Sequence, residues 1–72
     1  MNKEQTIELL RSFNYFVNDE IKYLELDNLY VVKNRYEIED YMLEAIQRIF
    51  KIKKMRVVQG QISMTLKRLD EE

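Results

Sequence analysis

The apolar positions of the first third of the chain recur with helical spacing. At about 100° per residue, one face of the segment collects Leu9, Leu10, Phe13, Phe16, Val17, Ile21 and Leu24. The opposite face collects Glu8, Arg11, Asp19 and Lys22. Asn2 is a favourable N-cap, and Gln5 occupies the capping-box position three residues later. The pattern therefore predicts an amphipathic helix over residues 3–24.

The middle of the chain carries a second helical pattern after a turn. Turn-forming residues occupy 25–28, and residues 29–32 suit either a short strand or the first turn of the next helix. Asn34 and Glu37 have capping-box spacing, which predicts a helix start near residue 35. The apolar positions of this helix cover about half of its circumference. They are Met42, Leu43, Ala45, Ile46, Ile49, Phe50 and Ile52.

Residues 53–69 allow two interpretations. Helical spacing connects Met55, Val58, Ile62, Leu66 and Leu69. Gly60 and the Val57-Val58 pair weaken a helix there. A hairpin around Gln59-Gly60 instead produces three opposed pairs: Met55 with Met64, Val57 with Ile62, and Arg56 with Ser63. The hairpin is favoured because it separates polar from apolar side chains more completely.

These elements predict a mainly α (small α+β) protein. Two antiparallel amphipathic helices would be followed by a C-terminal β-hairpin, with a three-helix bundle as the alternative. Residues 1–72 form one small domain, near the size at which a single core supplies about 3–5 kcal/mol. The sequence contains neither Cys nor His, which excludes disulfides and Cys/His zinc sites. A second copy of the chain is the remaining support, so we expect a homo-oligomer.

Hydropathy predicts a soluble, cytoplasmic protein without a membrane partner. The longest apolar run comprises residues 29–32, far fewer than the roughly 18 residues that a transmembrane helix requires. No apolar signal-peptide segment follows residues 1–5.

Charge divides the chain into two parts. Residues 1–47 carry ten acids and five bases, whereas residues 48–68 carry seven cations and neither Asp nor Glu. The formal net charge of -1 hides this division. Such an asymmetry orients an approaching partner, although it does not identify one.

The residue types exclude most catalytic arrangements. Without His or Cys the chain lacks an imidazole base and a thiolate nucleophile. A single Gly excludes a Walker loop and a dinucleotide-binding fingerprint. We therefore expect a protein that is not an enzyme and that uses no cofactor.

The acidic residues of the predicted second helix give no metal site. Glu37, Asp40 and Glu44 share one helical face. Because one helix supplies too few oxygen ligands, a solvated acidic face near a helix N-terminus explains them better than a cation site.

Two other acids, Glu20 and Glu39, lie within apolar helical arcs. In an antiparallel bundle they would meet at one end, either as a catalytic carboxyl pair or as rim residues paired with Lys33 or Arg35. The rim interpretation is favoured because no pocket or third group accompanies the pair.

The cations of the C-terminal third are the first candidate partner-binding residues. Arg48, Lys51 and Lys54 step along the predicted helix by threes, and Arg56 lies on the polar face of the predicted hairpin. They could contact successive phosphates. Against this, a helix C-terminus favours cations through its dipole, and the chain is acidic overall with a pI of about 5.5.

Tyrosines supply the second group of candidates. Tyr15, Tyr23, Tyr30, Tyr36 and Tyr41 lie in the acidic part, mostly at the edges of the apolar arcs. Tyr offers a large, rigid contact area with a polar tip, which suits both interfaces and core edges. Tyr15, Tyr36 and Tyr41 are therefore added to the candidate partner-binding residues.

Three functional hypotheses follow. The first is a small regulatory or adaptor protein that binds another protein with an acidic surface, acting as a homodimer. The second is a nucleic-acid-binding regulator that uses the basic segment 48–68. The third is a small scaffold or virion assembly protein.

Overall fold

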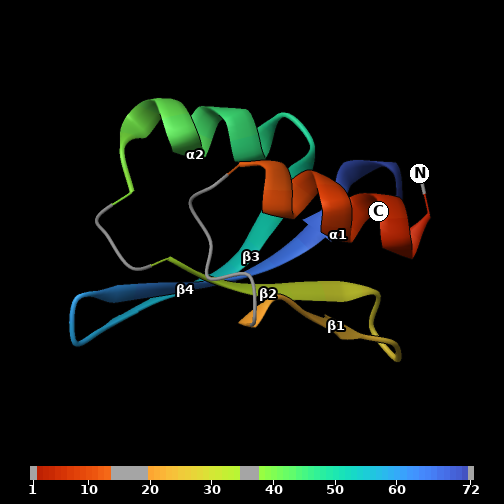
Figure 1. Cartoon of the computed structure of the whole chain (residues 1–72), viewed down its shortest axis with the longest axis horizontal. Coiled ribbons are helices and arrows are strands. Elements are labelled where there is room, and N and C mark those ends of the chain that lie inside the picture. Colours follow the sequence, from red (N-terminus) through yellow and green to blue (C-terminus); the bar gives the residue numbers. More distant parts are fainter. Residues whose placement is uncertain (1, 14–19, 35–37, 72) are drawn as a thin grey trace.

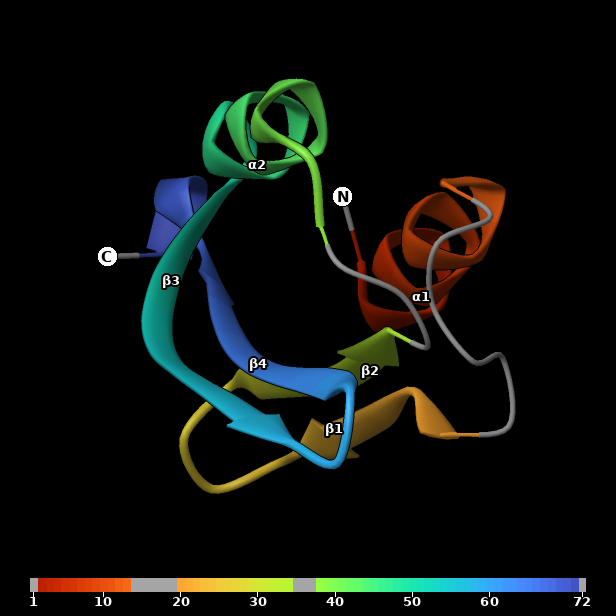
Figure 2. The same cartoon turned by 90° about the vertical axis from the view of Figure 1, so that its left-hand side faces the viewer.

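The computed structural model describes residues 2–13, 20–34 and 38–71. Its elements are α1 (Lys3–Ser12), β1 (Lys22–Leu24), β2 (Leu29–Asn34), α2 (Asp40–Gln47), β3 (Phe50–Val58), β4 (Gln61–Arg68) and the 3-10 helix η2 (Leu69–Glu71). The strands form one antiparallel sheet in the order β1-β2-β4-β3. Both α-helices lie on the same side of this sheet, which curves around them (Figure 1, Figure 2).

The predicted mainly α fold is wrong, and so is the alternative of a three-helix bundle. The chain forms an α+β structure of two consecutive helix–strand–strand units, α1-β1-β2 and α2-β3-β4. The units meet through the antiparallel pairing of β2 with β4 at the centre of the sheet. The sheet, rather than a pair of helices, is therefore the framework of the protein.

The first helix begins as predicted but is much shorter. The capping box is confirmed. The backbone N–H of Gln5 donates to Asn2 Oδ1 at 2.8 Å, and the backbone N–H of Asn2 donates to Gln5 Oε1 at 2.9 Å. The helix ends at Ser12, and residues 14–19 lie outside the described residues. Residues 22–24 pair with 29–31 instead of continuing a helix. The spacing of Leu24 from the earlier apolar residues suits a helix, but in the strand Leu24 lies on the same, exposed side as Lys22, and Tyr23 turns inward.

The second helix is also shorter than predicted. Asn34 does not cap it, because this residue ends β2 and is buried. The N-cap is Glu39, which makes no side-chain capping hydrogen bond, and Glu37 lies outside the described residues. The helix stops at Gln47, and β3 starts at Phe50. Ile49, Phe50 and Ile52 keep helical spacing with the preceding residues, so the apolar pattern does not show where the helix ends.

The C-terminal hairpin has the predicted register. Met55 pairs with Met64, Arg56 with Ser63, and Val57 with Ile62. The helical interpretation of residues 53–69 is therefore wrong. Gln59 and Gly60 form the turn with φ values of 51° and 76°, which fits a type I′ turn, the connection whose twist matches the flanking strands.

Substitutions in this turn are expected to act in opposite directions. A Cβ at Gly60 would meet nothing within 4 Å, so Gly60→Ala costs only backbone strain, about 1 kcal/mol of unfolding free energy. Gln59→Asn is expected to add roughly 0.5 kcal/mol, because Asn tolerates positive φ better than Gln. Urea unfolding followed by circular dichroism measures both. Equal effects of the two substitutions would contradict the assigned turn.

The core lies between the sheet and the helices. Its buried residues are Leu10, Tyr30, Val32, Ile46, Phe50, Ile62, Met64 and Leu66. The rings of Tyr30 and Phe50 contact edge to face with centroids 6.2 Å apart. Most of these residues come from the inner faces of β2 and β4, the two central strands.

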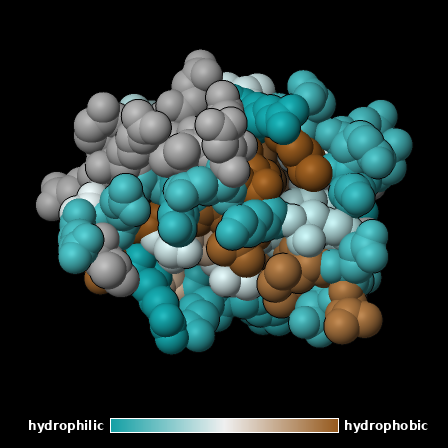
Figure 3. All heavy atoms as spheres, turned by 60° about the horizontal axis from the view of Figure 1, so that its bottom comes forward, coloured by the Kyte–Doolittle hydropathy of each residue, from teal (hydrophilic) through white to brown (hydrophobic). Residues whose placement is uncertain are grey.

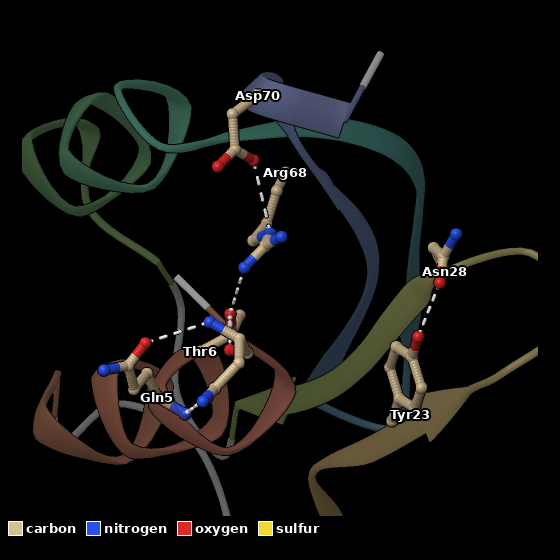
Figure 4. A network of polar contacts seen from close by, with 7 residues as sticks. Gln5, Thr6, Tyr23, Asn28, Arg68 and Asp70 are labelled. Carbon is tan, nitrogen blue, oxygen red and sulfur yellow. Dashed lines mark hydrogen bonds and ion pairs between the residues drawn. The ribbon is translucent and has the colours of Figure 1, made fainter.

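One cation, Arg68, is buried on the helix side of the sheet. Its Nη1 donates to Thr6 Oγ1 at 3.0 Å, and its Nε lies 3.3 Å from Asp70 Oδ1 (Figure 4). Thr6 in turn donates to the Asn2 carbonyl at 2.8 Å. This network attaches α1 to the end of β4, so Arg68 has a structural role.

Candidate functional site

The face of the sheet that turns away from the helices is here called the outer face. In β4, buried residues at 62, 64, 66 and 68 alternate with more exposed residues at 61, 63, 65 and 67. In β2, buried residues at 30, 32 and 34 alternate with 29, 31 and 33. Directly paired residues of neighbouring strands share a face. The register therefore assigns every outer-face position in β1 and β3.

The outer face carries a group of cations drawn from all four strands. The six residues are Lys22 of β1, Lys33 of β2, Lys51, Lys54 and Arg56 of β3, and Lys67 of β4. No Asp or Glu occupies an outer-face position in these strands. A chain with a formal net charge of -1 thus has a strand surface of one sign. Figure 3, which brings the underside of Figure 1 forward, shows mainly hydrophilic side chains with smaller apolar areas between them.

A β-bulge contributes to this concentration of charge. Ile52 pairs with Leu66, whereas the next paired residue of β3, Lys54, pairs with Thr65. One extra residue, Lys53, is accommodated between them. Without the bulge, strict alternation would turn Lys54 toward the helices. The bulge returns it to the outer face together with Arg56.

The structure separates the residues that the sequence proposed for partner binding. Lys51, Lys54 and Arg56 lie together on the outer face. Arg48 is the C-cap residue of α2, on the helix side of the sheet, and Tyr41 belongs to the same helix with 58% of its surface exposed. Tyr15 and Tyr36 lie outside the described residues.

The helix dipole does not explain Lys51 and Lys54, because both belong to β3 and not to the last turn of a helix. Sequence reasoning also missed Lys22 and Lys33, which belong to the acidic part of the chain. Only the pairing of β1 with β2 and of β2 with β4 brings them to the same face. The sequence allowed a short strand at residues 29–32 beside the helical alternative, and the strand is confirmed as part of β2. Its pairing partners were not predicted.

Small hydroxyl side chains lie among the cations. Ser63 pairs with Lys33 on one side and with Arg56 on the other, and Thr65 pairs with Val31 and Lys54. The aromatic residues of the described strands, Tyr23, Tyr30 and Phe50, occupy inner-face positions. The outer face therefore offers charge and hydroxyl groups beside the apolar side chains of Leu24, Leu29 and Val31. Its strand positions offer no ring on which a base could stack.

A hollow lies at the end of the outer face near the β3–β4 turn. It has a volume of about 290 Å³ and is lined by Lys33, Arg56, Gln59, Gln61 and Ser63. Glu20 Oε1 lies 3.6 Å from Lys33 Nζ, so one of the predicted rim pairs is present. Glu39, the N-cap of α2, takes no part in that pair. Since the two-helix bundle does not exist, the predicted meeting of Glu20 and Glu39 at its end loses its basis.

A larger, more open hollow of about 660 Å³ lies between α1 and the β1–β2 turn. Its lining mixes charges, with Lys3 against Glu25 and Asp27, and it includes Tyr23, whose ring centroid is 5.2 Å from Lys3 Nζ. It has no concentration of one charge, and it supplies no catalytic set. Among the described residues, no group of three or more acids is placed to hold a metal ion.

Comparisons of the chain with protein-family models, with curated proteins and with solved structures gave no match. In the described ranges, every helix is too short and too polar to span a membrane. The role of the outer face is therefore inferred from the charges and hydrogen-bonding groups of its own residues.

Proposed function

We propose that the protein binds nucleic acid through the outer face of its sheet, as a non-enzymatic regulator. The observation that carries this proposal is the set of six cations from four strands, with no acid at any outer-face strand position. Lys and Arg that neutralise phosphates release condensed counterions, which supplies most of the sequence-independent affinity for nucleic acid. The hydroxyls of Ser63 and Thr65 add the kind of hydrogen bond that fixes a protein on a phosphate backbone.

A duplex suits this face better than a single strand. Proteins that bind single strands without sequence preference stack successive bases on aromatic side chains, and the outer-face strand positions have none. Three spacings of about 4.8 Å between four strands make the face about 14 Å wide. This width is comparable to the major groove of about 12 Å, so cations of β1 and β3 can contact phosphates on opposite sides of it.

The two other hypotheses remain predictions. A regulatory protein that binds an acidic protein surface would use the same cations and hydroxyls toward carboxylates, so only a direct comparison of polyanions separates it from the proposal. A homodimer is compatible with nucleic-acid binding, because the outer face lies on one side of the sheet and leaves the edge of β3 for another contact. A scaffold or virion component would assemble beyond a dimer, which sedimentation would detect.

The affinity for duplex is expected to depend steeply on salt. Six contacts would give a slope of about −5 in a plot of log K against log salt concentration, and four contacts about −4. Fluorescence anisotropy with a labelled duplex of mixed sequence, in DNA and RNA forms, between about 50 and 200 mM NaCl measures this slope. A polyglutamate peptide of equal charge serves as the control polyanion.

Three outcomes would contradict the proposal. The first is no binding of either duplex at the lowest salt concentration. The second is affinity that does not change with salt, since the proposed contacts release counterions. The third is tighter binding of polyglutamate than of duplex, which would favour the acidic protein partner.

A further inference from the structure

The hollow beside the β3–β4 turn has a more specific arrangement than the rest of the outer face. Lys33, Ser63 and Arg56 form one row across β2, β4 and β3, with Ser63 directly paired to both cations. The Cα atoms of the two cations are therefore separated by two strand spacings, about 10 Å. All three residues line the hollow. The row thus places a cation on each side of a residue that carries a hydroxyl.

The chemistry of this lining fits a tetrahedral oxyanion. A guanidinium gives paired hydrogen bonds to phosphate oxygens, and an ammonium acts as a point charge. Ser63, Gln59 and Gln61 also line the hollow, and their side chains carry further hydrogen-bond donors. The volume of about 290 Å³ is well above the roughly 10–15 Å³ that one water molecule needs by the same kind of measure. A phosphate group with part of its hydration shell can be accommodated.

The turn residue Gln59 supports this assignment independently. It has a φ of 51°, a conformation that Asn or Gly adopts at lower cost. The residue nevertheless lines the hollow. A Gln side chain carries an amide donor, which gives a reason for Gln at a position where its backbone is less favourable. A residue other than Gly or Asn that keeps a positive φ beside a charged hollow is typical of a functional position.

We propose that this hollow is a subsite that holds one phosphate group of the bound nucleic acid. The inference rests on the proposed function for the source of the phosphate, although the hollow can be tested without any nucleic acid. Arg56 and Lys33 bind the phosphate oxygens from opposite sides, and Ser63 donates from between them. Because the other outer-face cations make diffuse contacts, this subsite fixes the position of the backbone relative to the β3–β4 hairpin.

Glu20 competes with the phosphate for Lys33. Its carboxylate lies 3.6 Å from the Lys33 ammonium, and both side chains are partly exposed, at 39% and 43%. A bound phosphate must share or replace this contact. Removing the carboxylate charge with Glu20→Gln therefore strengthens phosphate binding, whereas the loss of a merely structural ion pair would leave phosphate binding unchanged or weaken it.

The test uses the whole ¹⁵N-labelled chain titrated with inorganic phosphate, at constant ionic strength maintained with NaCl. Nuclear magnetic resonance follows the side-chain amides of Gln59 and Gln61 and the backbone amide of Gly60. We expect saturable shifts in the millimolar range. We expect about tenfold weaker binding in Arg56→Gln and in Ser63→Ala, and about threefold tighter binding in Glu20→Gln. Amide spectra confirm that each variant is folded.

The matched control is Lys51→Glu with Lys67→Glu, a directly paired couple on the outer face at the end of β3 and β4 away from the hollow. It should retain saturable phosphate shifts while losing duplex binding. Shifts in the wild type that increase linearly and spread over all outer-face amides would overturn the subsite, even if duplex binding is intact. Saturable shifts without duplex binding would instead overturn the proposed function, so the two failures are distinguishable.

A second arm identifies the source of the phosphate. Affinities are compared for duplexes of one sequence with and without a 5′-phosphate. Preference for the phosphorylated end that disappears in Arg56→Gln assigns the subsite to a terminal phosphate. Equal affinities, both reduced by Arg56→Gln, assign it to the backbone. Affinities that Arg56→Gln does not change would overturn the subsite.

Discussion

Replacing Lys51 and Lys54 with glutamate is expected to abolish duplex binding while leaving the fold intact. The two changes remove two of six outer-face cations and add two negative charges among the remaining four. At about 50 mM salt, the expected loss of affinity is at least roughly a hundredfold, and the salt slope falls by about 2. Both side chains are exposed, so the free energy of unfolding should change by less than about 0.5 kcal/mol per site.

The matched control is Arg11→Glu with Arg48→Glu. It makes the same change in net charge on α1 and at the C-cap of α2, on the helix side of the sheet. Anisotropy with the same labelled duplex should show a loss of less than about fivefold, from the changed net charge alone. If both double variants lose equal affinity, binding follows the total charge of the protein, and the outer face is not the interface.

The sequence predicted the charge division but not the surface that results from it. Segment 48–68 was visibly cationic, yet Arg68 is buried against Thr6 and Arg48 lies on the helix side. Lys22 and Lys33 reach the outer face from the acidic part through strand pairing. The long-range pairing of β2 with β4 determines this face. Such pairing has no local signature that periodicity could detect.

The helices were overestimated for a related reason. An apolar residue at every third or fourth position fits one long helix, but it also fits a shorter helix followed by short strands. This chain has no Pro and only one Gly to mark where one element ends and the next begins. The hairpin of β3 and β4 was predicted in register because its turn carried a local signal at Gln59-Gly60. The bulge between Ile52 and Lys54 had no such local signal. The extra residue is a lysine among other lysines, so the sequence does not mark where it is inserted.

Sequence pattern also could not distinguish two methionines that lie directly opposite each other. Met55 of β3 and Met64 of β4 are paired on the inner face, as the hairpin prediction required. Met64 is fully buried, whereas 42% of the surface of Met55 is exposed. The difference arises because β4 is central and β3 is an edge strand. Burial here depends on which strands the helices cover.

This pair gives the largest expected effect on stability. Met64→Ala should lower the free energy of unfolding by about 2–5 kcal/mol through lost burial and the cavity that remains. A single core of this size provides only about 3–5 kcal/mol, so the variant should be largely unfolded at 25 °C or have a urea midpoint about 2 M lower. Met55→Ala makes the same chemical change at its partner position and should cost less than about 1 kcal/mol. Far-UV circular dichroism in urea measures both.

The Met55 and Met64 variants also test the predicted homodimer. Met55 and Val57 form an exposed apolar area at the β3 edge, with 42% and 69% of their surfaces accessible. In a monomer, the small effect of Met55→Ala is independent of protein concentration. If a second copy covers this edge, the urea midpoint of the wild type increases with concentration, and Met55→Ala reduces that increase. Equal losses from Met55→Ala and Met64→Ala at every concentration would contradict the assignment of β3 as an uncovered edge within one chain. Comparing dilute and concentrated samples therefore separates burial within the fold from burial by a second copy.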